Sequence, residues 1–107
     1  MKNGTHQEAS ELFHILSHQA RLAILDELRK DEACVCHLQA VLKRPQAYVS
    51  QQLRVLREAN LVTDERDGTL VYYRLADPGV ERLLDNVLGP AGEPTRMAEC
   101  SCPRCQR

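Results

Sequence analysis

The feature that most constrains the fold of this chain is a change in the spacing of its apolar residues near residue 61. Before that point, apolar side chains recur about every three to four residues, as in amphipathic helices. Beyond it, residues 61–66 and 70–75 have the composition of short strands and flank Asp67-Gly68, a dipeptide typical of two-residue hairpin turns. The sequence therefore predicts one β-hairpin within an otherwise helical chain.

Helical segments lie on both sides of this hairpin. The predicted helices cover residues 7–17, 19–30, 36–42, 46–59 and 77–88. Lys43-Arg44-Pro45 separates the third and fourth helices as a tight turn, because proline cannot continue a helix and disfavours helical geometry at the preceding residue. Asp77-Pro78 is a typical helix start, and Gly89-Pro90 ends the last helix. This order predicts a mostly α fold with a β-hairpin wing, the winged helix-turn-helix, whose fourth helix enters the DNA major groove.

The length of 107 residues allows one small domain. We predict that residues 1–88 form a DNA-binding and dimerisation domain. Residues 89–107, with three prolines and few apolar groups, are predicted to be a flexible cysteine-containing tail. No apolar run approaches the roughly 18 residues of a membrane span, and the first ten residues lack the apolar core of a signal peptide. A cytoplasmic location with reduced thiols and no membrane partner is expected.

The segment from residue 43 to residue 57 is locally basic, with four cations and no acidic residue, although the net charge of the chain is −1. Such a patch can bind phosphates, and polar side chains on the helix that follows can read base edges. We therefore predict double-stranded DNA as a partner; the alternative is an ordinary solvated helix face. The predicted contacts in the turn and helix are Lys43, Arg44, Gln46, Tyr48, Ser50, Gln51 and Arg54.

The predicted hairpin offers two further DNA contacts, Arg66 and Thr69, near its tip. Asp64, Glu65 and Asp67 lie close to them in the sequence and would repel DNA. The contribution of the wing to DNA affinity is therefore expected to be small.

Five cysteines occur in two clusters, Cys34-Val35-Cys36 and a C-x-C-x-x-C motif at Cys100, Cys102 and Cys105. Thiolates select soft ions: trivalent arsenic and antimony take three of them, and cadmium, lead and zinc also favour thiolate-rich sites. Within a regular helix, residues i and i+2 point about 200° apart. Cys34 and Cys36 can therefore bind one ion only if they lie at a helix start or if that start unwinds.

The preferred hypothesis is an ion bound by Cys34, Cys36 and one or two of the tail cysteines, from the same chain or its partner. Unwinding the helix start would then move the DNA-reading helix that follows and weaken DNA binding. Two alternatives remain at this stage. The tail motif could bind an ion alone, or Cys34 could be a small buried apolar residue and the tail an unstructured segment.

Four stretches resemble the ArsR/SmtB family of metal-sensing repressors: residues 16–25 (LSHQARLAIL), 34–38 (CVCHL), 45–62 (PQAYVSQQLRVLREANLV) and 67–75 (DGTLVYYRL). The resemblance covers roughly residues 10–88. It implies a homodimer that binds operator DNA when metal-free and releases it on binding an inducer. It also implies a dimer interface formed by the first and last helices. The candidate interface residues are Leu12, Phe13, Leu16, Leu83, Leu84 and Val87, some of which can instead belong to the core.

The chain departs from the family pattern at three positions. The arsenic-type motif often reads Cys-Val-Cys-Asp-Leu-Cys, whereas His37 and Gln39 stand here in place of the Asp and the third Cys. The third thiol must then come from elsewhere or be absent. His37 could bind zinc or cadmium, or be solvated or bonded to the backbone. Gln52 stands where the recognition helix of the family often has His.

The sequence therefore predicts a repressor induced by trivalent arsenic or antimony, with cadmium, lead or zinc as alternatives. A second interpretation keeps the DNA binding and makes the cysteines a thiol-redox or reactive-sulfur sensor, because Cys102 and Cys105 have disulfide-prone spacing. An enzyme is not expected, since thiol oxidoreductase chemistry at a C-x-x-C motif requires a βαβ setting.

Overall fold

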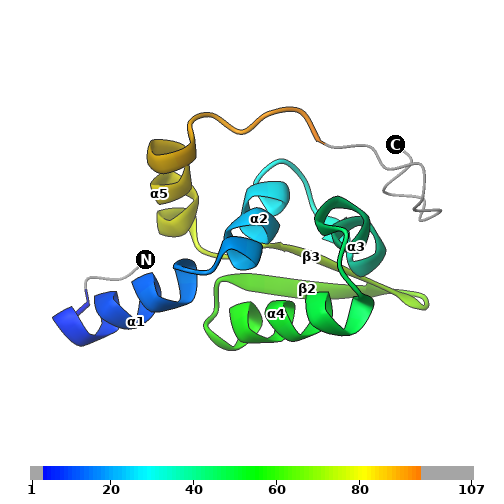
Figure 1. The fold of residues 1–107 in the computed structure, drawn as a ribbon, viewed down its shortest axis with the longest axis horizontal. Helices are drawn as coiled ribbons and strands as arrows, with labels where there is room; N and C mark the ends of the chain where they lie inside the picture. The colour runs from blue at the N-terminus through cyan, green and yellow to red at the C-terminus, as the bar shows by residue number, and fades with distance from the viewer. Residues whose placement is uncertain (1–3, 95–107) are drawn as a thin grey trace.

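The computed structural model describes residues 4–94, which form five helices and a three-stranded sheet (Figure 1). The elements in chain order are α1 His6–Leu16, α2 Gln19–Leu28, β1 Ala33–Cys34, α3 Val35–Leu42, α4 Gln46–Glu58, β2 Val62–Asp67, β3 Leu70–Leu75 and α5 Pro78–Leu88. The predicted winged helix-turn-helix is confirmed. None of the helices described between residues 4 and 94 has the length and apolar content needed to cross a membrane.

The sheet contains a strand that the sequence did not indicate. Its order is β1-β3-β2 with antiparallel pairing throughout, so the wing strand β3 lies between its hairpin partner and β1. In β1, Ala33 pairs with Tyr73 and Cys34 pairs with Tyr72. The first cysteine is therefore a strand residue, held against the wing before α3 begins.

The hairpin turn lies one residue later than predicted. Asp67 pairs with Leu70, so the two central residues are Gly68 and Thr69 rather than Asp67 and Gly68. Gly68 has φ +65°, and Thr69 does not have a positive φ. A hairpin turn with a positive φ only at its first central residue is of the II′ kind, which requires glycine at that residue.

Local sequence signals explain the boundaries of the later helices. Lys43 ends α3 in the left-handed conformation, with φ 57°, and Pro45 immediately precedes α4. The carboxylate of Asp77 accepts hydrogen bonds from the backbone N–H groups of Gly79 at 2.8 Å and Val80 at 3.4 Å. The predicted start of α5 at Asp77-Pro78 is therefore confirmed.

The core lies between the helices and the inner face of the sheet. Ile24, Leu25, Leu38, Val49, Leu53, Leu56 and Val80 have no measurable exposure. Three polar side chains, Glu27, His37 and Gln52, are also buried. Because a buried polar group without a partner is costly, each is expected to have one, and the contacts below show which.

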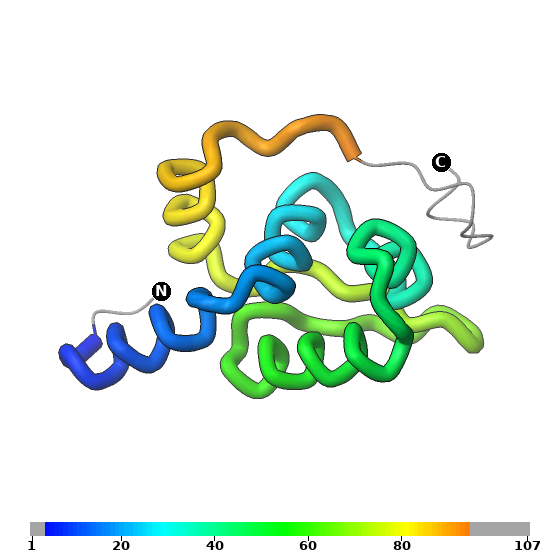
Figure 2. The backbone as a smooth tube through the Cα atoms, in the orientation of Figure 1, coloured from blue at the N-terminus to red at the C-terminus, as the bar shows by residue number. Residues whose placement is uncertain are grey.

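The two terminal helices α1 and α5 lie at the end of the molecule opposite the tip of the β2–β3 hairpin (Figure 2). Arg29, at the end of α2, fixes α5 to the rest of the fold. Its Nε donates to Asp26 Oδ1 at 2.8 Å, and its Nη1 donates to Asp85 Oδ1 at 2.7 Å and to the Gly89 carbonyl at 2.6 Å. Burial acts to lower the pKa of Arg29, but the hydrogen bonds with Asp26 and Asp85 raise it above its ordinary value.

Candidate nucleic-acid interface and cysteine site

Helix α4 separates a buried face from an exposed polar face. Val49, Gln52, Leu53 and Leu56 point into the core. The predicted contacts Gln46, Ser50, Gln51 and Arg54 are all exposed. The helical period thus brings these four predicted DNA contacts to one surface, free of the packing that holds the helix in place, whereas the fifth, Tyr48, is half-buried.

Two arginines of α4 form ion pairs at its surface. Arg54 Nε lies 3.0 Å from Glu58 Oε1, one turn further along the helix. Arg57 Nη1 lies 3.0 Å from Asp64 Oδ2 and so links α4 to strand β2 of the wing. Exposed pairs of this kind contribute little stability, so DNA phosphates can compete for both cations.

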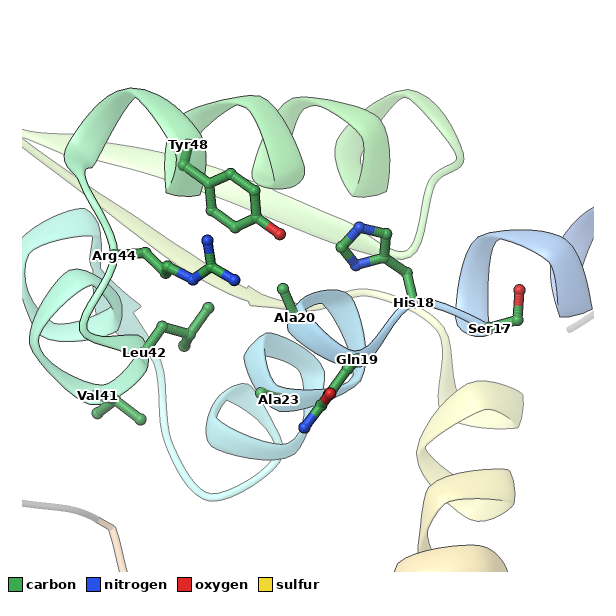
Figure 3. A pocket seen from close by; sticks show the side chains of 9 residues that line it. All are labelled: Ser17, His18, Gln19, Ala20, Ala23, Val41, Leu42, Arg44 and Tyr48. Atoms are coloured by element: carbon green, nitrogen blue, oxygen red, sulfur yellow. The ribbon is translucent and has the colours of Figure 1, made fainter.

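The turn before α4 presents two exposed cations, Lys43 and Arg44. The guanidinium carbon of Arg44 lies 4.7 Å from the centre of the Tyr48 ring, which is within the range of a cation–π contact. Tyr48 is half-buried and lines a hollow of about 640 Å³ between α2, α3 and α4 (Figure 3). Arg44 is therefore held near the start of the recognition helix by an aromatic surface rather than by an acid.

The wing residues Arg66 and Thr69 are exposed, as are the acidic residues Asp64, Glu65 and Asp67. Strand β2 is exposed from its second residue to its end. The wing therefore presents both signs of charge, in line with a small contribution to DNA affinity.

Cys34 and Cys36 converge at the junction of β1 and α3, where their sulfurs lie 2.6 Å apart. Cys34 precedes α3 in an extended conformation, with φ −87° and ψ 169°, and Cys36 is the second residue of the helix. The first of the two conditions set by the sequence, a position at a helix start, is therefore met. In this arrangement the two sulfurs point toward each other although α3 is intact.

The side chains that pack around the two cysteines come from the wing strand β3. Tyr72 is 2% exposed and packs against Cys34, with Cys36 and Leu70 beside them. Tyr73 and Leu75, on the opposite face of the same strand, pack against the main core. The alternation of side chains along a strand predicts that Leu70 and Tyr72 lie on one face of β3. The sequence did not indicate strand β1, however, and only its pairing with β3 shows that this face meets the cysteines.

Cys100, Cys102 and Cys105 lie outside the described residues. Within residues 4–94, no three or more His, Cys, Asp or Glu side chains gather into a set able to hold a metal ion. Cys34 and Cys36 supply two donors, and trivalent arsenic takes three. The predicted site of three thiolates is therefore not found within the part of the chain that the structure describes.

His37 is buried, and among the described residues its ring bonds to a carboxylate through Nε2, whereas its Nδ1 has no hydrogen-bond partner. Its Nε2 lies 3.2 Å from Glu27 Oε1, and Glu27 Oε2 accepts from Lys30 Nζ at 2.8 Å. His37 and Glu27 are each 7% exposed. A carboxylate from α2 therefore occupies one ring nitrogen of His37 and ties α3 to α2.

The six candidate interface residues divide by burial. Leu16 and Leu84 belong to the core of this single chain, and Leu12 and Leu83 pack partly against it. Phe13 and Val87 are 56% and 69% exposed. These two, joined by Leu88 at 46%, are the large apolar side chains that the described surface leaves uncovered on α1 and α5.

Residues 18–64 match the family model of bacterial regulatory proteins of the arsR family. The transcriptional repressor SmtB of Mycobacterium tuberculosis is 41% identical over 85 residues, which are 79% of this chain and 63% of that protein. This chain thus spans somewhat less than two thirds of that relative. The arsenical resistance operon repressor of Bacillus subtilis is 40% identical over 71% of this chain and 73% of the repressor.

Solved structures agree with this assignment. NolR from Sinorhizobium fredii superposes with a TM-score of 0.71 at 29% identity, covering 85% of this chain and 100% of NolR. The homodimeric winged helix-turn-helix domain Mb0332 from Mycobacterium bovis gives 0.66 at 30% identity, covering 82% of this chain and 87% of that domain. The two curated relatives, SmtB and the arsenical resistance operon repressor, are transcriptional repressors, in agreement with the prediction that this chain is not an enzyme. The chain therefore belongs to the ArsR/SmtB family of winged helix-turn-helix transcriptional regulators.

Proposed function

We propose that this chain is a homodimeric repressor whose operator DNA is released when trivalent arsenic or antimony binds Cys34, Cys36 and one or two of Cys100, Cys102 and Cys105. The observation that carries the proposal is the convergence of the Cys34 and Cys36 sulfurs, 2.6 Å apart, at the start of α3. The names of two relatives support the choice of inducer. They are the arsenical resistance operon repressors of Bacillus subtilis and Escherichia coli, 40% and 42% identical to this chain.

The same junction supports a route from the ion to the DNA. Cys34 pairs with Tyr72 of the wing strand, and Cys36 lies in α3, which leads through the Lys43–Pro45 turn into α4. An ion that draws both sulfurs to its own bond lengths displaces β1 relative to α3. This displacement moves both the wing and α4, because β1 pairs with wing strand β3 and α3 leads into α4. A coupling of about 1–3 kcal/mol would weaken DNA binding roughly 5- to 150-fold.

The tail is the proposed source of the further thiolates. Its first residue, Gly89, is fixed to the end of α2 by the hydrogen bond from Arg29. From Pro94, the last described residue, to Cys100 there are six residues, which span at most about 20 Å when extended. We propose that the donor comes from the tail of the same chain or from that of its partner.

The dimer is proposed to form through α1 and α5. Both helices lie at the end of the molecule opposite the hairpin tip (Figure 2). Phe13 of α1 and Val87 of α5 are exposed. An interface at that end leaves the wing of each chain accessible to DNA. A cytoplasmic location, where thiols stay reduced, suits the proposed site.

A DNA-release titration of the full chain tests the proposal. A fluorescent duplex, selected from a random-sequence pool by the protein itself, is titrated in a reducing buffer with arsenite, antimonite, cadmium, lead and zinc. Arsenite and antimonite are expected to release it, and Cys34→Ser and Cys36→Ser to abolish the response while DNA still binds. Ser101→Ala is the matched control within the tail and should respond normally.

The other outcomes separate the alternatives. If only cadmium, lead or zinc released the DNA, the inducer would be a divalent ion bound by the same cysteines, rather than arsenic or antimony. Release only by an oxidant would favour the thiol-redox sensor. A response that survives in both cysteine variants would overturn the proposed site.

A further inference from the structure

Helix α4 has the wing on one side and a hollow on the other. On one side, Arg57 is paired with Asp64 of the wing. On the other, Tyr48 borders the hollow of about 640 Å³ that separates α4 from the start of α2 (Figure 3). His18 and Gln19 line the hollow from α2, and Arg44 lines it from the turn before α4. None of its lining residues is acidic.

The hollow carries unused hydrogen-bonding capacity. Within residues 4–94, no carboxylate pairs with the exposed guanidinium of Arg44, whereas Arg54 and Arg57 each have an acidic partner. Arg44 is instead held over the ring of Tyr48. The Nδ1 atom of His18 is buried and has no hydrogen-bond partner among the described residues. The guanidinium of Arg44 and the imidazole of His18 thus line the same concave surface, which has no acidic residue, and this chemistry suits an anion.

A helix that enters the major groove lies between the two phosphate backbones that border the groove. The wing stands beside one border of α4, and the hollow stands beside the other. We propose that the hollow receives the sugar-phosphate backbone on the side opposite the wing, with Arg44 and His18 binding a phosphate. The inference rests on the proposed DNA binding and adds His18, from outside the helix-turn-helix pair α3–α4, to the contacts that sequence patterns indicated.

The test uses the full chain and a duplex selected by the unmodified protein from a random-sequence pool. Each phosphate contact contributes about 0.9 to the slope of log affinity against log salt. Arg44→Gln is therefore expected to lower that slope by about 0.9 without changing sequence preference. Arg82→Gln removes the same charge from an exposed position on α5 and should leave the slope unchanged. His18→Phe, which keeps a ring but no nitrogen, should weaken binding about tenfold.

Neutral methylphosphonate linkages in the duplex locate the contact. Neutral linkages along one side of the groove should weaken DNA binding by the unmodified protein. The same linkages should have little effect on the affinity of Arg44→Gln, because this variant already lacks the contact. Equal sensitivity of Arg44→Gln and the unmodified protein at every linkage would overturn the inference. Arg44 is exposed, so this result does not depend on whether His18→Phe disturbs α2. Failure to select any duplex would instead refute the proposed DNA binding itself.

Discussion

Asp77 makes the start of α5 sensitive to pH. Burial acts to raise the pKa of this carboxyl group, but hydrogen bonds that include those from the amides of Gly79 and Val80 outweigh it, and the pKa lies below its ordinary value. A pKa lowered by folding means that the ionised carboxylate stabilises the folded state. This stabilisation is complete above the unfolded pKa of about 3.9 and is lost as the pH falls through the folded value.

Asp77→Ala is therefore expected to lower the free energy of unfolding by about 1 kcal/mol at pH 7, the usual cost of a lost helix cap. The difference from the unmodified chain should shrink when both are compared near pH 3. Urea unfolding followed by circular dichroism at the two pH values measures it. Glu81→Ala removes a nearby exposed acid of the same helix and serves as the control; a pH-independent difference for Asp77→Ala would contradict the assignment.

Gln52 shows how a single departure from the family pattern is used structurally. Its Oε1 accepts a hydrogen bond from Arg21 Nε at 2.8 Å, and the side chain is 6% exposed. The residue therefore connects α4 to α2 from the buried side of the recognition helix. The sequence could not show whether Gln52 is exposed to DNA or buried, because its burial depends on a hydrogen bond with an arginine 31 positions earlier.

Gln52→Leu should cost about 1–3 kcal/mol of stability, because Arg21 loses a buried acceptor. Adding Arg21→Met should recover part of that loss, since both polar partners are then removed. Urea unfolding of the two single variants and the double variant gives the coupling energy. Strict additivity of the two single effects would mean that the hydrogen bond contributes nothing measurable.

At the scale of elements, the hairpin turn depends on one glycine. Gly68 has φ +65°, a conformation that a side chain makes unfavourable by about 1–2 kcal/mol. We expect Gly68→Ala to lower the free energy of unfolding by that amount, whereas Thr69→Ala, at the other central residue of the turn, should change it by less than about 0.5 kcal/mol. Thermal unfolding distinguishes the two; equal effects would indicate a turn of another kind.

Most elements were predictable because each has a local cause. The helices follow from apolar periodicity, Pro45 and Asp77, and the hairpin from alternation and a glycine. Strand β1 was not predictable, since two residues cannot show an alternating pattern. It exists because β3 has an edge available for pairing, a feature of the assembled sheet. The turn was misplaced by one residue because the pairing of β2 with β3, rather than the dipeptide alone, selects the central residues.

The candidate sites were predictable to a similar degree. The exposure of Gln46, Ser50, Gln51 and Arg54 follows from the helical period alone. The convergence of Cys34 and Cys36 does not, because it depends on α3 beginning at Val35 rather than one residue later. The pairing of His37 with Glu27 required the packing of α3 against α2, which no local pattern specifies.

At the scale of the whole molecule, α2 connects the three functional regions. Glu27 bonds His37 beside the cysteine pair, Arg21 bonds Gln52 of the recognition helix, and Arg29 bonds Asp85 of α5. Each contact involves a side chain that is buried or partly buried. The cysteine junction, the recognition helix α4 and the proposed dimer helix α5 are therefore all bonded to α2 or to its C-terminal end.

The proposed dimer gives a prediction at this scale. Val87→Asp places a charge on an exposed apolar position of α5 and should yield a monomer that keeps its helical content. Asn86→Asp adds the same charge at the neighbouring exposed position and should remain dimeric. Light scattering gives the mass, and circular dichroism gives the fold. A dimeric Val87→Asp would rule out this surface as the interface.

The burial of Cys34 also has a consequence for the speed of the response. Its side chain is 2% exposed and lies in β1, which pairs with β3, so we expect the sulfur to become accessible to an ion when this strand opens. A strand of two residues opens locally far more often than the whole chain unfolds. At high inducer concentration, the rate of DNA release should therefore reach a plateau set by this opening, because diffusion of the ion no longer limits it.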